Sequence, residues 1–169
     1  MRTFQDAQKE TDTLYKSLVQ IADDIIKKHT LDIDKTIKNL ENNIENVSNE
    51  ELRKYTLKLA TMAYTLGDKV EHADFKRDCA NAILKETTAR EFSLASGPVA
   101  AKQTTATLNT AQESAVNLLY DMVANSLKTK LQMINRIIDS IKNVLISRTA
   151  EAKIENQLGF GTKEKEETY

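Results

Sequence analysis

Apolar residues recur at alternating spacings of three and four along residues 108–154, a stretch that contains no Pro or Gly. Its second half repeats strictly in steps of four, three, four, three and four, at Leu127, Leu131, Ile134, Ile138, Ile141 and Leu145. This spacing places the six side chains on one stripe of a long helix, as in a coiled-coil seam. A helix of this length would extend about 70 Å and needs partner helices. We therefore expect the stripe to mediate oligomerisation, with packing against helices of the same chain as the alternative.

The N-terminal region shows two shorter apolar patterns of the same kind. The first predicts a helix over residues 4–29 with one apolar face: Phe4, Ala7, Leu14, Leu18, Ala22 and Ile25. The second begins within residues 30–34, which supply candidate N-caps, and steps by four, three, four and three: Ile33, Ile37, Leu40, Ile44 and Val47. Two seams around a polar break predict an antiparallel helical hairpin over residues 1–47, and one bent helix is the alternative.

A third helix is expected to begin at a capping box. In Ser48-Asn49-Glu50-Glu51, the Ser48 hydroxyl can accept from the Glu51 amide while the Glu51 carboxylate accepts from the Ser48 amide. The apolar pattern that follows passes through Gly67, which costs about 1 kcal/mol relative to Ala in a helix interior. Gly67 therefore indicates close backbone packing or a local bend.

The clearest break in the chain is Ser96-Gly97-Pro98, which combines a helix-ending glycine with a proline that cannot continue the helix. Two long antiparallel helices are thus predicted over residues 48–155, joined around the small-residue segment 96–114. The periodicity stops near Asn156, and a disordered tail is predicted over residues 156–169.

The composition agrees with an all-α protein, here an elongated helical bundle with coiled-coil-like hairpins and a long C-terminal helix. Four Gly, one Pro, no Trp and 29% charged against 40% hydrophobic residues are typical of such bundles. No run approaches the roughly 18 apolar residues of a membrane span, and residues 1–6 do not resemble a signal peptide. A cytoplasmic location without membrane contact is predicted, with the single cysteine, Cys79, as a buried small residue.

The sequence offers no catalytic, metal or cofactor motif. His72 has acidic neighbours, but no Glu-x-x-His repeat on a second helix accompanies it. We interpret this segment as a solvated, salt-bridged face that includes Lys69, Lys76 and Arg77. Phosphate-binding loops, nucleophile elbows, CxxC and HExxH are missing from the sequence. The protein is predicted not to be an enzyme and to use neither a metal nor a cofactor.

Basic charge is concentrated in the last predicted helix. Residues 126–155 carry six basic and three acidic side chains, whereas residues 1–50 carry seven basic and ten acidic ones. Five cations flank the apolar stripe and are the candidate phosphate-binding residues: Lys128, Lys142 and Lys153 on one side, Lys130 and Arg148 on the other. Such rows can follow a phosphate backbone. The alternative is that they pair with acids on neighbouring helices.

The central and C-terminal parts also resemble a known family. The segments that carry the resemblance are Leu57–Ala60, Gly67–Val70, Ala80–Lys85, Asn117–Tyr120, Ile137–Lys142 and the pair Ser147-Arg148. In this order around a small-residue break, they are similar to the UvsY-type recombination mediator proteins of bacteriophages. The similarity covers about residues 50–156.

The resemblance implies a non-enzymatic factor that binds single-stranded DNA, forms homo-oligomers and works in the cytoplasm of the bacterial host. Its expected partners are a RecA-type recombinase, which it would help to load, and the single-strand-binding protein that covers the DNA. The acidic N-terminal region does not match the family and is expected to recruit a protein partner. The alternative is a helical protein–protein interaction module without nucleic-acid binding, such as a phage assembly factor or an inhibitor of a host or defence protein.

Overall fold

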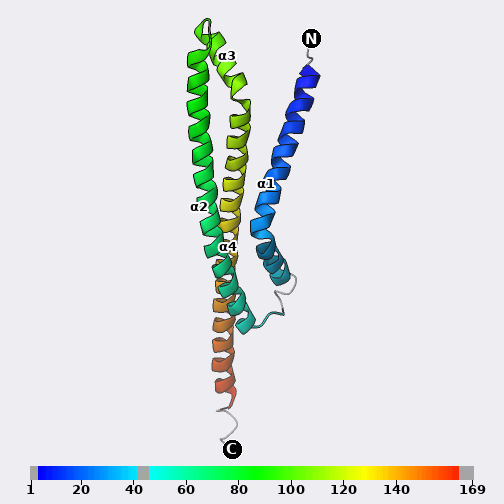
Figure 1. The fold of residues 1–169 in the computed structure, drawn as a ribbon. Helices are drawn as coiled ribbons and strands as arrows, with labels where there is room; N and C mark the ends of the chain where they lie inside the picture. The colour runs from blue at the N-terminus through cyan, green and yellow to red at the C-terminus, as the bar shows by residue number, and fades with distance from the viewer. Residues whose placement is uncertain (1–3, 42–45, 164–169) are drawn as a thin grey trace, which may run out of the picture. The chain divides into compact units, whose positions relative to one another are not determined.

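The computed structural model describes residues 4–41 and 46–163, and every regular element in these ranges is a helix. The helices are α1 (Phe4–Glu41), α2 (Asn49–Leu94), α3 (Val99–Asn109) and α4 (Ala111–Lys163) (Figure 1). The all-α fold class is confirmed, and the longest of these helices is α4, with 53 residues. No helix in the described ranges combines the length and the apolar character that crossing a membrane requires.

Helix α1 continues through residues 30–34, so the hairpin predicted over residues 1–47 is wrong and the alternative of one helix describes the segment. Residues 30–34 contain neither Gly nor Pro, and their Thr and Asp residues favour a helix end only weakly. Thr30 and Ile33 are both buried, at 1% and 4% exposure. The inward-facing surface of the helix is therefore maintained across the predicted break. Ile44 lies outside the described residues.

Helix α2 begins with the predicted capping box. The Glu51 amide donates to the Ser48 hydroxyl at 3.2 Å, and the Ser48 amide donates to the Glu51 carboxylate at 3.0 Å. The helix continues through Gly67 without interruption. A Cβ atom added at Gly67 would meet nothing within 4 Å, so the prediction of close backbone packing there is wrong.

Helix α2 ends at Leu94, just before the predicted break. Gly97 has φ +106°, a conformation that side-chain-bearing residues rarely adopt. Pro98 precedes α3, and its carbonyl accepts from the Lys102 amide at 3.1 Å. The small residues that follow form the short helix α3, over Val99–Asn109.

Helix α4 continues to Lys163, so the disordered tail predicted from residue 156 is wrong for residues 156–163. Gly159 and Gly161 lower helix propensity, but neither clashes with a helical backbone as a proline would. Residues 164–169 lie outside the described residues.

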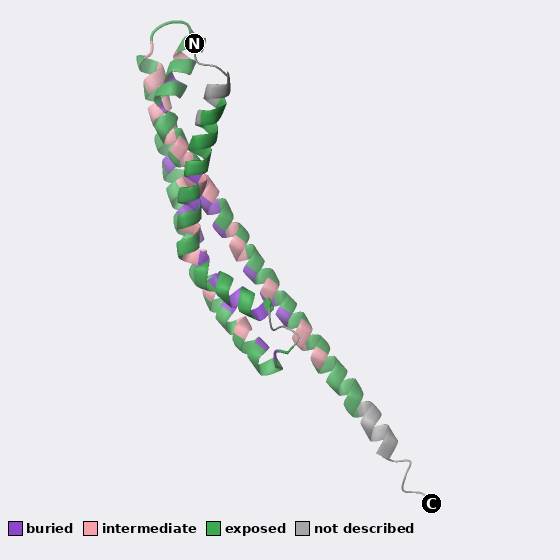
Figure 2. Ribbon diagram, turned by 90° about the vertical axis from the view of Figure 1, so that its right-hand side faces the viewer, coloured by how far each residue is buried: buried purple, intermediate pink, exposed green. Residues whose placement is uncertain are grey.

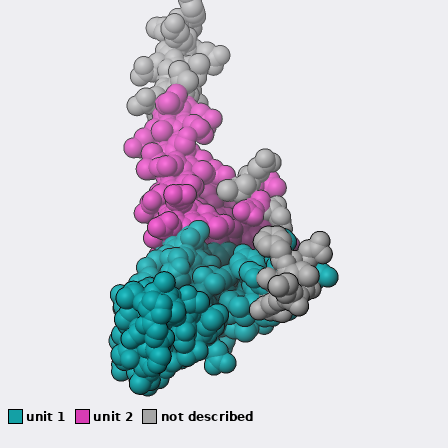
Figure 3. Space-filling view, turned by 90° about the horizontal axis from the view of Figure 1, so that it is seen from above, with its two compact units in different colours: residues 1–32, 64–131 teal, residues 33–63, 132–169 magenta. Residues whose placement is uncertain are grey.

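The chain divides into two compact units, coloured separately in Figure 3. Unit 1 comprises residues 1–32 and 64–131, and unit 2 comprises residues 33–63 and 132–169. Each has a core of buried apolar side chains (Figure 2). The largest fully buried ones are Leu66 and Leu127 in unit 1, and Leu52, Leu59 and Ile134 in unit 2.

Within each unit, α2 and α4 are antiparallel. In unit 1, Thr88 near the end of α2 forms a hydrogen bond with Thr110, just before α4 begins. Asp74, earlier in α2, pairs with Lys128, later in α4. In unit 2 Arg148, late in α4, contacts Val47, which immediately precedes the α2 cap. The long helix thus has partners from its own chain in both units.

This arrangement changes the interpretation of the heptad stripe. Four of its residues are buried and two are half-buried: Leu127, Ile134, Ile138 and Ile141, and Leu131 and Leu145, respectively. Because helices of the same chain cover these side chains, the stripe does not offer an apolar face for oligomerisation. A homo-oligomer stays a prediction, and it requires a different surface.

The prediction that Cys79 is buried is wrong, because its side chain is exposed. Its neighbour Ala80 faces the core at 6% exposure. One residue along a helix turns the side chain by about 100°, which takes Cys79 to the outer surface of α2.

Candidate anion-binding cleft

The five cations predicted to bind phosphate are divided between the two units. Lys128 and Lys130 belong to unit 1, whereas Lys142, Arg148 and Lys153 belong to unit 2.

Several of these cations have partners within the chain. The Lys128 ammonium lies 2.7 Å from an Asp74 carboxylate oxygen, and Lys130 is half-buried with a partner of its own. Lys142 pairs with Asp139 one turn away on the same helix, at 3.0 Å. The Arg148 guanidinium donates to the main-chain carbonyl of Val47 at 2.7 Å. Lys153 is exposed. The alternative that these cations pair with acids on neighbouring helices therefore holds for Lys128, whose partner Asp74 is on α2. The partner of Lys142 is on its own helix, and Arg148 binds a main-chain carbonyl.

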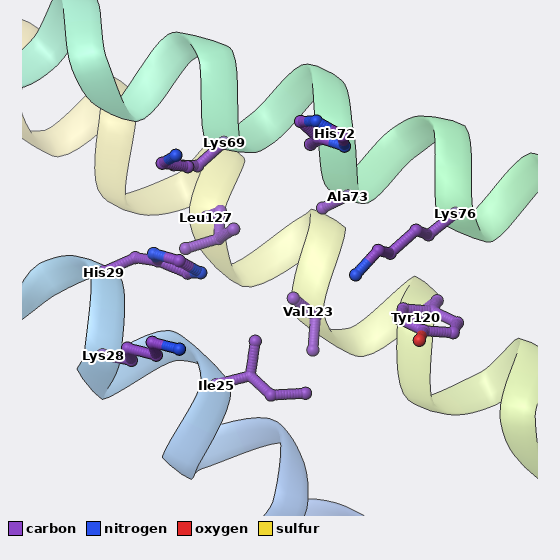
Figure 4. Close-up of a pocket in the computed structure, with 10 residues that line it drawn as sticks. All are labelled: Ile25, Lys28, His29, Lys69, His72, Ala73, Lys76, Tyr120, Val123 and Leu127. Atoms are coloured by element: carbon purple, nitrogen blue, oxygen red, sulfur yellow. The ribbon is translucent and has the colours of Figure 1, made fainter.

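A different set of basic residues meets in a cleft of unit 1, with a volume of about 380 Å³. Three helices of that unit contribute side chains to it (Figure 4). Its polar lining consists of Lys28 and His29 from α1, Lys69, His72 and Lys76 from α2, and Tyr120 from α4. We call this site the cationic cleft.

The floor of the cationic cleft is apolar and belongs to the core of unit 1. It is formed by Ile25, Ala73, Val123 and Leu127. Ala73, Val123 and Leu127 are 6%, 2% and 1% exposed, so they are fixed by packing. The polar residues stand beside this floor because they flank the apolar stripes of their helices. On α2, for example, the spacing of Lys69, His72 and Lys76 keeps all three on one side of the helix.

The lysines of the cationic cleft are not paired with carboxylates of the described residues. Among the side chains that the structure describes, no carboxylate oxygen lies within 4.0 Å of the ammonium groups of Lys28, Lys69 or Lys76. The carboxylates on the next turns of α2 are used elsewhere, since Arg77 pairs with Asp74 at 2.8 Å and with Asp78 at 2.9 Å. The predicted salt-bridged face is therefore correct for Arg77 and wrong for Lys69 and Lys76.

The charge state of His29 reflects this concentration of positive charge. Burial lowers the pKa of His29 below its ordinary value, and the nearby charges of Lys69, Lys28 and Lys76 lower it further. Both effects penalise the charged imidazolium. An anion bound in the cationic cleft would raise the pKa of His29 again, because its charge has the opposite sign to the lysine charges. The uncompensated positive charge of the lysines favours such an anion.

Tyr120 is the aromatic residue in this lining. The Lys76 ammonium lies 5.6 Å from the centre of its ring, within the range of a cation–π contact. Figure 4 shows the Lys76 side chain extending from α2 into the cleft, with Tyr120 on the neighbouring α4. The ring itself is half-buried, so part of its surface is open to the cleft.

The described residues contain no group of three or more His, Cys, Asp or Glu side chains that could hold a metal ion. His29 and His72 line the cationic cleft with lysines as neighbours. Lysines repel a metal cation and attract an anion, so the lining suits a phosphate or another anionic group.

Sequence reasoning identified parts of this cleft but not the whole. The spacing of Lys69, His72 and Lys76 on one helical face is legible in the sequence, although those lysines were expected to be paired. Lys28 and His29 could not be placed opposite them, because the predicted turn at residues 30–34 gives α1 a different path. Whether a lysine is paired depends on which carboxylates of other helices lie close to it, and the sequence does not give these distances.

Comparisons with known proteins add no assignment: no family model matches the chain, and neither a curated protein nor a solved structure matches it.

Proposed function

We propose that this chain is a non-enzymatic accessory protein that binds single-stranded DNA through the cationic cleft of unit 1. The observation that carries the proposal is the convergence of Lys28, Lys69 and Lys76, without carboxylate partners among the described side chains, above an apolar floor. Neutralising these lysines with phosphates would release counterions from the nucleic acid, which favours binding.

The arrangement suits a phosphate chain better than a single small anion. Lys69 and Lys76 are seven residues apart on α2, which corresponds to about 10 Å along the helix axis. That separation exceeds the size of one phosphate group but is spanned by neighbouring phosphates of a strand. Contacts of this kind position the backbone and carry little sequence information. The resemblance to UvsY-type mediators supports the choice of single-stranded DNA.

Fluorescence anisotropy with a labelled oligothymidylate tests the proposal. We expect micromolar binding at low salt, with log K falling against log salt concentration with a slope of about −2 if three phosphates are contacted. The double substitution Lys69→Glu and Lys76→Glu should abolish this binding. The matched control is Lys142→Glu with Lys153→Glu, two exposed cations of unit 2 with the same total charge change.

The outcomes separate the two sets of cations. Loss of binding in the α2 variant with retention in the control supports the cationic cleft. Equal loss in both variants would assign the effect to net charge and reject the cleft, and no binding of the unaltered protein at low salt would reject DNA binding altogether. Circular dichroism on each variant checks that the helices remain folded.

The recombination-mediator role is the more specific part of the proposal and is supported by the family resemblance. In that role the protein helps a RecA-type recombinase to displace single-strand-binding protein from DNA. A strand-exchange reaction with those two proteins should be stimulated by the unaltered chain and not by the Lys69→Glu, Lys76→Glu variant. If that variant also stimulates strand exchange, the stimulation does not depend on the cationic cleft.

A second candidate is a helical protein-binding module that does not bind nucleic acid. It is favoured by large apolar side chains that unit 1 leaves exposed on α2, namely Tyr64 at 76% and Phe75 at 67%. Leu94 at the end of α2 and Val99 at the start of α3 are also about 70% exposed. The absence of DNA binding at low salt, with intact helices, is the result that selects this candidate.

A further inference from the structure

We infer that Tyr120 is a stacking platform for one base of the bound strand, so that the cationic cleft holds a nucleotide unit and not only a phosphate. This inference rests on the proposed DNA-binding function and adds to it a residue that distinguishes single strands from duplexes. It concerns the end of the cleft that α4 forms.

The first argument is the size and lining of the cleft. Its volume of about 380 Å³ falls in the range of roughly 300–1,000 Å³ that is typical of small-molecule sites, so the cleft has room for more than a lone phosphate. The floor residues Ala73, Val123 and Leu127 offer no side-chain donor to phosphate oxygens. Apolar surface of this kind, with a few polar groups around it, is typical of a site for a partly apolar ligand.

The second argument is the position of the ring relative to the cations. The Lys76 ammonium lies 5.6 Å from the centre of the Tyr120 ring, so a phosphate bound at Lys76 would be adjacent to the ring. Val123 lies one turn further along α4 and continues the apolar surface from the ring into the floor. A nucleotide placed with its phosphate at Lys76 thus has its base next to Tyr120.

The third argument is that Tyr120 is held for this role at little entropic cost. Its ring is half-buried on a long helix, and an aromatic side chain has only two rotatable bonds to fix. Every base has a π-face, so stacking here would be tolerant of sequence. In a duplex the bases are already stacked and paired, so the platform would favour single strands over duplexes.

The test compares the unaltered protein with Tyr120→Ala, Tyr120→Leu and Tyr120→Phe on three labelled probes: an oligothymidylate, a strand of the same length made of abasic residues, and a duplex. Stacking of one base on an aromatic side chain corresponds to about a 5- to 150-fold change in affinity. Tyr120→Ala and Tyr120→Leu should weaken oligothymidylate binding by a factor in this range, and Tyr120→Phe should retain it. Tyr64→Ala is the matched control, an exposed tyrosine that does not line the cleft.

The abasic strand makes the result specific to stacking. We expect the unaltered protein and Tyr120→Leu to bind the abasic strand equally, because this strand has no base that could stack on the tyrosine ring. If Tyr120→Leu weakens binding to the abasic strand as much as to oligothymidylate, the role of Tyr120 is structural and the inference is overturned. Equal oligothymidylate affinity for the unaltered protein and Tyr120→Leu overturns it while leaving the proposed function in place. Failure of the unaltered protein to bind any of the probes rejects the proposed function itself.

Discussion

Arg148 donates a hydrogen bond of 2.7 Å to the main-chain carbonyl of Val47, and the same nitrogen lies 3.3 Å from the Asn49 side-chain oxygen. Val47 precedes Ser48, whose carbonyl accepts from the Leu52 amide at the start of α2, so the Val47 carbonyl lies outside the helix. The guanidinium therefore ties the late part of α4 to the start of α2 within unit 2. A side chain that the sequence pattern assigns to phosphate binding is used to hold two helices together.

We predict that Arg148→Ala lowers the free energy of unfolding by about 1.5–3 kcal/mol, the range for hydrogen bonds that involve a charged group. Arg148→Lys should recover part of this loss, because lysine keeps a charged donor but not the planar fork. Urea unfolding measures both variants, and their affinity for single-stranded DNA should equal that of the unaltered protein. Normal stability combined with weakened DNA binding would instead show that Arg148 contacts phosphate.

Loss of the cap at the start of α2 should destabilise the protein. Ser48→Ala removes the hydroxyl that accepts from the helix amide, and we expect the free energy of unfolding to fall by about 1 kcal/mol. Ser93→Ala is a suitable control, because that hydroxyl donates to a carbonyl near the opposite end of α2 and caps no amide. Equal effects of the two substitutions in urea unfolding would argue against the capping role.

The capping box should also give a pH-dependent contribution to stability. Hydrogen bonds from the Ser48 backbone amide and then from its side chain lower the pKa of Glu51 below its ordinary value. A carboxyl with a lowered pKa in the folded state stabilises the protein above its unfolded-state pKa, and this contribution is lost as the pH falls through the lowered value. The stability difference between the unaltered protein and Glu51→Gln should therefore be present at neutral pH and vanish in acid. A difference that is constant across the titration range would contradict this.

Replacing the two glycines of unit 1 by alanine should change the free energy of unfolding in opposite directions. Gly67→Ala should raise the free energy of unfolding by about 0.5–1 kcal/mol, because the added methyl group meets nothing within 4 Å and alanine favours the helix. Gly97→Ala should lower it by about 1–2 kcal/mol, because φ +106° is strained for a residue with a Cβ atom. Thermal or urea unfolding of the pair tests both signs, and a destabilised Gly67→Ala would reveal a packing constraint that the contacts do not show.

His29 should report on the cationic cleft directly. Its pKa is lowered by burial and by Lys69, Lys28 and Lys76, so the unfolded chain binds the extra proton first when the pH falls below the ordinary imidazole value. Acidification through this range should therefore reduce the stability of the unaltered protein relative to His29→Gln. Saturation with single-stranded DNA should raise the pKa of His29, because phosphates oppose the lysine charges. An NMR titration of the imidazole, assigned with His72→Gln, measures this pKa, and an unchanged value with DNA bound would place the DNA elsewhere.

The helical content, the apolar stripes and most of the helix ends follow from local rules that the sequence carries by itself. The capping box at Ser48 and the break at Gly97 depend on residues next to each other, and the pattern around Ile134 and Ile138 needs only the helical period. Local errors arose at residues 156–163, where two glycines lower helix propensity without ending α4, and at residues 30–34, where polar residues without Gly or Pro allow either a helix or a turn. There the burial of Thr30 and Ile33 favours the continuous helix.

Only the tertiary structure decided what the stripes and charges do. Periodicity fixes which side of α4 is apolar, but it does not determine whether the chain or a second copy covers that side. The same limit applies to charge, because a lysine such as Lys128 is neutralised only when a carboxylate lies within a few ångströms, whereas Lys76 is left to a tyrosine ring. The cationic cleft therefore becomes visible only in three dimensions, where α1, α2 and α4 bring residues about 40 to 100 positions apart into one site.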